Sequence, residues 1–150
     1  MKSTLLSLLS LTFAFSGCGN DDSPPPAPLT HRLEARITGT DLTGMDATVE
    51  IWRDYPLLDR LYVEALPTSV GKTVDLGTYG NQARVSGAIR FLAVAPGSST
   101  EPRPTTNLKL ELLADGRVIE TTVLNQAKTG FKVSTSPVLA GQAAIETAKL

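Results

Sequence analysis

Apolar and polar side chains alternate along most of this chain, and this period of two constrains the fold more than any other feature. Leu33, Ala35 and Ile37, for example, alternate with charged or hydroxylated neighbours. Successive side chains of a strand point to opposite faces of a sheet, so the pattern predicts strands with one buried face. We expect strands at 32–38, 48–52, 60–65, 70–76, 83–94, 107–113, 117–124 and 131–135. This spacing predicts an all-β domain, an antiparallel, immunoglobulin-like β-sandwich of seven or eight strands.

Three local features refine this prediction. Asp115-Gly116 separates two alternating runs and predicts a β-hairpin, because a type I′ turn needs positive φ at both positions. Gly87, inside a long strand pattern, predicts a bulge. Tyr55 to Asp59 suggests one helical turn, residues 96–106 a long proline-rich loop, and the last eight residues a frayed end or a short helix.

The N-terminal segment has a different character from the rest of the chain. Lys2 is followed by an apolar run from Leu5 to Phe15. Its 11 residues would span about 16 Å as a helix, against about 30 Å for a bilayer core. The segment therefore predicts a cleavable export signal rather than a transmembrane helix.

Small residues precede the single cysteine in Phe15-Ser16-Gly17-Cys18. This stretch resembles the lipobox of bacterial lipoproteins, with Phe15 where leucine is usual. The resemblance covers residues 1–18 and implies that residues 1–17 are removed. It also implies that Cys18 carries a diacylglycerol and further acyl chains such as palmitate, which anchor the mature chain stably in a membrane.

Residues 18–29 form the expected tether between the acylated cysteine and the domain at 30–150. The acidic stretch Gly19-Asn20-Asp21-Asp22-Ser23 is similar to the surface-export signal of Bacteroidetes lipoproteins, and a solubilising spacer is the alternative interpretation. Pro24 to Pro28 predicts an extended, semi-rigid stalk. We therefore expect a cell-envelope protein in the outer membrane. Display on the cell surface follows if the acidic stretch is an export signal rather than a spacer.

Charge and cysteine content limit the classes of function. The formal net charge is −1, so the chain lacks the basic excess with which proteins neutralise nucleic-acid phosphates. With Cys18 acylated, no disulfide can form within the chain. The domain is therefore expected to rely on its hydrophobic core alone.

The residues that carry catalytic and metal chemistry are sparse. His31 is the only histidine and lies where the tether meets the domain, so we expect a solvated linker residue rather than part of a catalytic triad. Calcium is the alternative ligand for four aspartates, although their spacing matches no EF-hand loop: Asp41, Asp46, Asp54 and Asp59. We expect no metal site and no cofactor.

Two short motifs resemble pieces of serine β-lactamase sites. Ser69 to Lys72 matches S-x-x-K and Lys128-Thr129-Gly130 matches K-T-G. In those enzymes the serine and lysine begin a buried helix, whereas both motifs here lie in strand or loop context. We therefore expect a non-enzymatic protein.

Aromatic side chains cluster at Trp52, Tyr55 and Tyr62, with Arg53 and Arg60 nearby. Trp52 and Tyr62 fall on the polar phase of their strands, so pairing of these strands would place both on one outer face. Exposed aromatic groups beside hydrogen-bonding side chains suit a protein partner or a sugar ring. The alternative is that this face is covered and that Trp52 lies in the core. Two functions follow: an accessory module that binds another envelope protein, or a module that binds a glycan or another small ligand.

Overall fold

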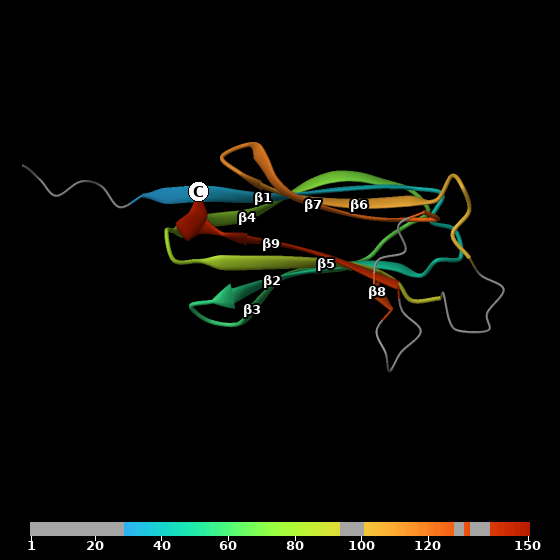
Figure 1. Cartoon of the computed structure of the whole chain (residues 1–150), viewed down its shortest axis with the longest axis horizontal. Helices are drawn as coiled ribbons and strands as arrows, with labels where there is room; N and C mark the ends of the chain where they lie inside the picture. Colours follow the sequence, from blue (N-terminus) through green and yellow to red (C-terminus); the bar gives the residue numbers. More distant parts are fainter. Residues whose placement is uncertain (1–28, 94–100, 128–130, 133–138) are drawn as a thin grey trace, which may run out of the picture.

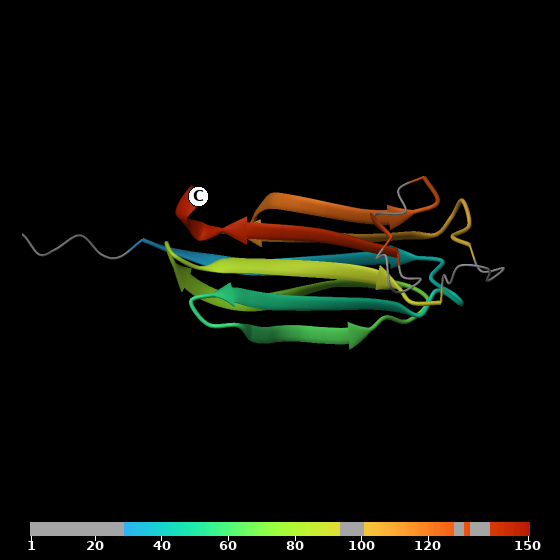
Figure 2. The ribbon, with the colours of Figure 1, turned by 60° about the horizontal axis from the view of Figure 1, so that its bottom comes forward.

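Two antiparallel β-sheets packed face to face make up the domain, as Figure 1 and Figure 2 show. The structure is a computed structural model that describes residues 29–93, 101–127, 131–132 and 139–150. The predicted all-β sandwich is confirmed. Within the described ranges, no helix has the length and apolarity that crossing a membrane requires. The predicted signal segment, Cys18 and the stalk lie outside these ranges, as do Lys128-Thr129-Gly130 and residues 133–135 of the last predicted strand.

The first sheet has the strand order β4-β1-β6-β7 and the second the order β3-β2-β5-β9-β8. The strands of the first sheet are β4 (Val70–Gly80), β1 (Thr30–Thr40), β6 (Asn107–Ala114) and β7 (Arg117–Asn125). Those of the second are β3 (Asp59–Ala65), β2 (Ala47–Tyr55), β5 (Arg84–Phe91), β9 (Leu139–Glu146) and β8 (Phe131–Lys132). A single turn of 3-10 helix, η1 (Thr147–Lys149), follows β9.

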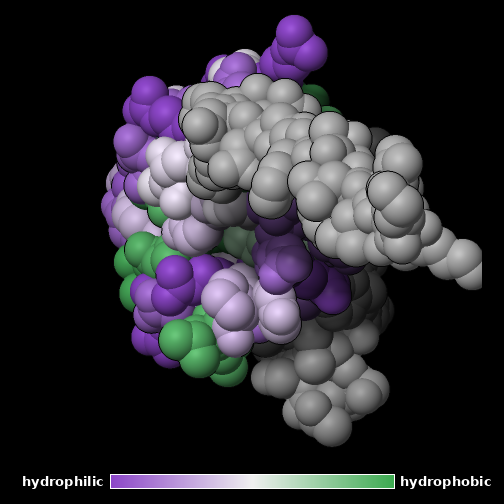
Figure 3. Space-filling model, turned by 90° about the vertical axis from the view of Figure 1, so that its left-hand side faces the viewer, coloured by the Kyte–Doolittle hydropathy of each residue, from purple (hydrophilic) through white to green (hydrophobic). Residues whose placement is uncertain are grey.

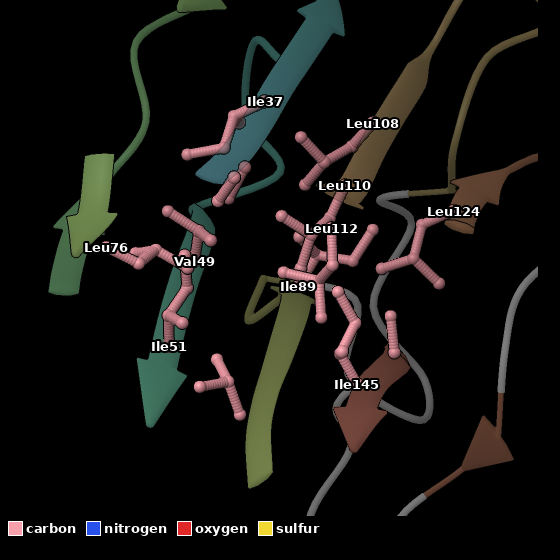
Figure 4. Close-up of a cluster of buried hydrophobic side chains, with 14 of the residues drawn as sticks. Ile37, Val49, Ile51, Leu76, Ile89, Leu108, Leu110, Leu112, Leu124 and Ile145 are labelled. Atoms are coloured by element: carbon pink, nitrogen blue, oxygen red, sulfur yellow. The ribbon is translucent and has the colours of Figure 1, made fainter. Parts of the chain in front are cut away.

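The core lies between the sheets and is made of the apolar phase of the central strands (Figure 4). In β1 the side chains of Leu33, Ala35 and Ile37 are fully buried, as the alternation predicts. Val49 and Ile51 of β2 face them from the other sheet and are also fully buried. Removing these apolar side chains from water is the main force that holds the two sheets together.

The β6–β7 hairpin confirms the prediction from Asp115-Gly116. Both residues have positive φ, 51° for Asp115 and 77° for Gly116. Asparagine, aspartate and glycine adopt this conformation more easily than other residues, which is why they favour such turns.

The C-terminal segment differs from the prediction of a frayed end or a short helix. Residues 139–146 form β9, which pairs with β5 along its whole length, and only three residues then form η1. The segment is rich in alanine and glycine, which have low intrinsic β propensity. Its strand conformation comes from burial of Ala143 and Ile145 beside β5. With this strand, the described residues form nine strands.

Gly87 is not a bulge. It pairs regularly with Ile51 and Ala143. A Cβ at this position would lie 2.6 Å from Cδ2 of Leu110 in the opposite sheet. The residue is a glycine because a leucine of the facing sheet fills the space of its side chain.

The connection between β2 and β3 is a tight hairpin rather than the helical turn expected at Tyr55 to Asp59. β2 ends at Tyr55 and β3 begins at Asp59, so residues 56–58 make the whole connection. The long loop expected at 96–106 is described from residue 101, and Thr106 within it is buried and donates a hydrogen bond from its hydroxyl to the carbonyl of Asp41 (3.0 Å).

Candidate functional site

The predicted aromatic group is divided between the two faces of the second sheet. Directly paired residues of antiparallel strands share a face. Trp52 pairs with Arg60 of β3 and with Ser86 of β5, and all three lie on the outer face. Tyr62 pairs with Ile51 and packs against the core. The expectation that Trp52 and Tyr62 share an outer face is therefore wrong.

A β-bulge between β2 and β3 explains the difference. The register shifts between Ile51 and Trp52, so that Leu61 has no partner of its own. An extra residue on one strand inverts the alternation beyond it. Tyr62 consequently turns inward, and Val63, expected on the apolar face, is 49% exposed.

Tyr62 has a structural role at the open side of the sandwich, where β3 and β4 are the edge strands. Its hydroxyl donates a hydrogen bond to the Glu64 carboxylate, and the ammonium group of Lys72 donates to the same carboxylate. Lys72 also lies over the Tyr62 ring, with Nζ 5.3 Å from the ring centroid. The hydrogen bonds from Lys72 and Tyr62 lower the pKa of Glu64. This group joins the edges of the two sheets.

Arg53 and Tyr55 do not share Trp52's partners: Arg53 pairs with the buried Val85, and beyond a second register shift Tyr55 pairs with Arg84 of β5. The Arg53 guanidinium donates to the Leu57 carbonyl (3.3 Å) and to Asp59 (3.1 Å), so it fixes the β2–β3 connection. Tyr55 ends β2 and is 53% exposed. Of the five residues predicted for a ligand face, only Trp52 and Arg60 are brought together.

A hollow of about 630 Å³ opens on the outer face of the second sheet beside Trp52. Two paired rows of residues cross it. One runs Trp52, Ser86, Ala144 and the other Glu50, Ala88, Gln142. The hollow is lined by Trp52, Asp54, Arg84, Ser86, Gly87, Ala88, Arg90, Glu120, Gln142, Ala143 and Ala144. Small residues on β5 and β9 therefore form its floor, and larger side chains form its walls.

Charged groups around the hollow are compensated by ion pairs. Arg90 contacts Glu50 at 2.7 Å, and Arg84 lies 3.7 Å from Asp54. The hydrogen bond from Arg90 is the largest cause that lowers the pKa of Glu50, and a hydrogen bond from Trp52 adds to it. The hollow thus presents hydrogen-bonding groups without a large excess of either charge.

Trp52 is held in place by its neighbours. Cζ of Arg60 lies 4.6 Å from the centroid of its ring and covers one face of the indole from the β3 side. Ser86 of β5 is the paired neighbour of Trp52 on the other side. The hollow lies on the other side of β2, over β5 and β9. Fixing an aromatic side chain in advance lowers the entropy lost when a ligand binds.

The sequence did not identify Arg90, Ser86, Gln142 and Ala144 as parts of a site. Ser86 and Arg90 lie on the polar phase of a predicted strand, which was a usable signal. Gln142 and Ala144 belong to β9, which was not predicted as a strand, so nothing placed them beside β5.

His31 is not a solvated linker residue. It lies in β1, is 9% exposed, and has Nδ1 2.7 Å from the Asp115 carboxylate in the β6–β7 turn. The same carboxylate accepts the backbone N–H of Arg32 at 3.0 Å. The hydrogen bond from His31 is the main cause that lowers the pKa of Asp115. The pair ties the turn to the first strand.

Three of the aspartates considered for calcium are engaged by arginines. Asp41 contacts Arg103 at 3.2 Å, while Asp54 and Asp59 contact Arg84 and Arg53. Among the residues that the structure describes, no group of three or more histidine, cysteine, aspartate or glutamate side chains could hold a metal ion.

Comparison with protein-family models, curated proteins and solved structures finds no match for this chain. The functional conclusion therefore depends on the sequence and the geometry of the site.

Proposed function

We propose that this chain is a lipid-anchored, non-enzymatic binding module of the cell envelope that takes a glycan in the hollow beside Trp52. The observation that carries the proposal is a fixed indole at the wall of a hollow of about 630 Å³. Its floor is made of small residues and its walls carry hydrogen-bonding side chains. Ligand sites in proteins have this size and combine an apolar surface with a few polar groups.

The chemistry of the walls favours an uncharged, hydroxyl-rich ligand. Arg90 and Glu50 compensate each other, as do Arg84 and Asp54. An anionic ligand would have to compete with Glu50 or Asp54 for an arginine, and a cationic ligand would find one carboxylate outside these pairs, Glu120, whereas a sugar ring needs no ion pair. Sugar rings offer an apolar face for the indole, and their hydroxyls can donate to Glu120 and accept from Gln142.

The position of the hollow on a sheet, rather than in a loop, also supports binding. Trp52, Ser86 and Ala144 lie side by side on three paired strands. Their spacing is fixed by backbone hydrogen bonds, so a ligand meets a surface that needs little rearrangement. Sites built on strands hold their geometry better than sites on loops.

The membrane anchor is the second part of the proposal. It is supported by Cys18, the only cysteine of the chain, which follows a short apolar run and two small residues. Acyl chains on this cysteine would hold the domain at the outer membrane through a proline-rich stalk, with surface display open as an alternative to the periplasmic side.

A glycan library screened against the acylated full chain in detergent tests the binding site. We expect one glycan class to bind, and Trp52→Ala to weaken its binding about fivefold, since one aromatic contact contributes on the order of 1 kcal/mol. Ala144→Leu should abolish binding, because it fills the floor of the hollow and removes no polar group.

A matched variant serves as the control. Ala65→Leu makes the same change at an exposed position of β3 outside the lining of the hollow. It should bind like the wild type. Glycan binding that is insensitive to Ala144→Leu would contradict the proposed site. A bound envelope protein with no glycan would favour the accessory-module alternative.

A further inference from the structure

Exposed apolar side chains gather at one end of the sandwich. We call this the tether end. It consists of the start of β1, the β2–β3 connection at 56–58, the β6–β7 turn with the first residues of β7, and the C-terminal η1 (Figure 1, Figure 2). Nine large hydrophobic residues of the described ranges are exposed, and only Val63 and Leu92 lie elsewhere. The other seven are Leu29, Tyr55, Leu57, Leu58, Val118, Ile119 and Leu150.

The β2–β3 connection presents the most exposed of these groups. Leu57 is 70% exposed and Leu58 is 73% exposed. Arg53 holds the connection by donating to the Leu57 carbonyl at 3.3 Å and to Asp59 at 3.1 Å. The two leucines therefore project from a fixed turn. Figure 3, which faces this end, shows green apolar surface beside purple polar surface. Apolar groups grouped in this way mark an interaction surface.

Several charges at or beside the tether end are paired. Arg53 contacts Asp59 at 3.1 Å, and Lys149 contacts Glu146 at 2.6 Å. Arg84 lies 3.7 Å from Asp54. Such an end offers no basic cluster to an acidic partner or to anionic lipid headgroups. Its attraction is apolar, which suits the boundary between headgroups and acyl chains.

The chain that precedes the domain joins it at this same end. Ten residues, Gly19 to Pro28, separate Cys18 from Leu29, and they can span at most about 36 Å. The 11-residue strand β1 is itself about 36 Å long. An anchor at Cys18 therefore keeps the tether end close to the bilayer. A short tether raises the local concentration of a surface so that weak contacts become populated.

We propose that the tether end rests on the lipid surface, with Leu57 and Leu58 inserted at the headgroup boundary. This inference rests on the proposed acylation of Cys18. In this orientation the strands extend away from the membrane. The hollow beside Trp52 is then open on the flank of the domain, where a glycan can reach it.

Site-specific labelling of the acylated full chain tests the orientation. Leu57→Cys introduces a free thiol at the tether end and Leu92→Cys introduces one at the opposite end, where the native side chain is 45% exposed. Each is labelled with an environment-sensitive fluorophore after reconstitution into phosphatidylcholine vesicles. We expect brominated lipids to quench the label at 57 at least about threefold more than the label at 92, and aqueous iodide to do the reverse.

The outcomes separate the two parts of the account. Equal quenching of both labels in vesicle-bound protein would overturn the orientation and leave the anchor standing. A label at 57 that is shielded from both quenchers would also overturn it, because this end would then contact protein. A chain that does not enter the vesicle fraction would overturn the anchor, and the orientation with it.

Discussion

Arg60 lies over the indole ring of Trp52, with Cζ 4.6 Å from the ring centroid. The two residues are opposite each other on β3 and β2. The contact covers the face of the ring on the β3 side and fixes Trp52 as the wall of a hollow that opens over β5 and β9.

Removal of the Arg60 side chain should loosen this wall. We expect Arg60→Ala to lower the free energy of unfolding by about 0.5–1 kcal/mol, the usual contribution of an exposed cation–π contact. Iodide should then quench the fluorescence of Trp52, the only tryptophan, more efficiently. Arg60→Lys keeps the charge and should fall between the wild type and Arg60→Ala. Unchanged quenching in Arg60→Ala would show that Arg60 does not shield the ring.

The Glu50–Arg90 pair predicts a pH dependence of stability. The folded-state pKa of Glu50 lies below its ordinary value of 4.5, mainly because of the hydrogen bond from Arg90. The charged form therefore stabilises the fold above about pH 4.5, and this contribution is lost as the pH falls through the folded-state pKa.

Substitution of Glu50 should remove this dependence. At pH 7, Glu50→Gln should be less stable than the wild type by no more than about 1 kcal/mol, because both partners are partly exposed. The difference should shrink as the pH falls below 4.5. Urea unfolding followed between pH 3 and pH 7 measures it, and a difference that is constant over this range would contradict the assignment.

The contact between Gly87 and Leu110 predicts that the loss of stability on replacing a glycine by alanine depends strongly on which glycine is replaced. Gly87→Ala places a Cβ 2.6 Å from Cδ2 of Leu110 and should destabilise the domain by about 1–3 kcal/mol. Gly80→Ala is the matched control, because no atom lies within 4 Å of its added Cβ. It should change stability by less than about 0.5 kcal/mol. Equal losses in thermal or chemical unfolding would contradict the packing described for Gly87.

Local alternation was enough to predict the central strands whose inner faces make the core. In β1 from Leu33 to Ile37, and in β2 up to Ile51, every second side chain is apolar and buried in the core. The β6–β7 hairpin was predictable because Asp115 and Gly116 are adapted to the backbone of the turn. In these elements the local preference and the packing in the fold agree.

Two features could not be predicted because they arise from pairing between strands. The bulge at Leu61 inverts the faces of β3, and no residue type in that segment marks it. Strand β9 has a composition with low β propensity and becomes a strand through pairing with β5. Of the site, only Trp52 and Arg60 were predicted. Ser86 and Arg90 lie on a predicted strand, but Gln142 and Ala144 belong to β9, which was not predicted.

The anchor predicts the behaviour of a single-residue variant. Cys18→Ala removes the only thiol that can be acylated, and we expect the protein to move from the membrane fraction to the soluble fraction of the cell envelope. Ala65→Leu, a change within the domain, should remain in the membrane fraction. A Cys18→Ala variant that still sediments with membranes would show that lipidation is not what holds the protein.

The most direct test of the central claim follows the indole N–H of Trp52 by NMR during titration with glycans. Because the chain has one tryptophan, its single indole resonance reports on the hollow without ambiguity. The account predicts that one class of glycan shifts this resonance saturably and that Ala144→Leu removes the response. If a glycan binds and the indole resonance stays where it is, the hollow beside Trp52 is not the binding site.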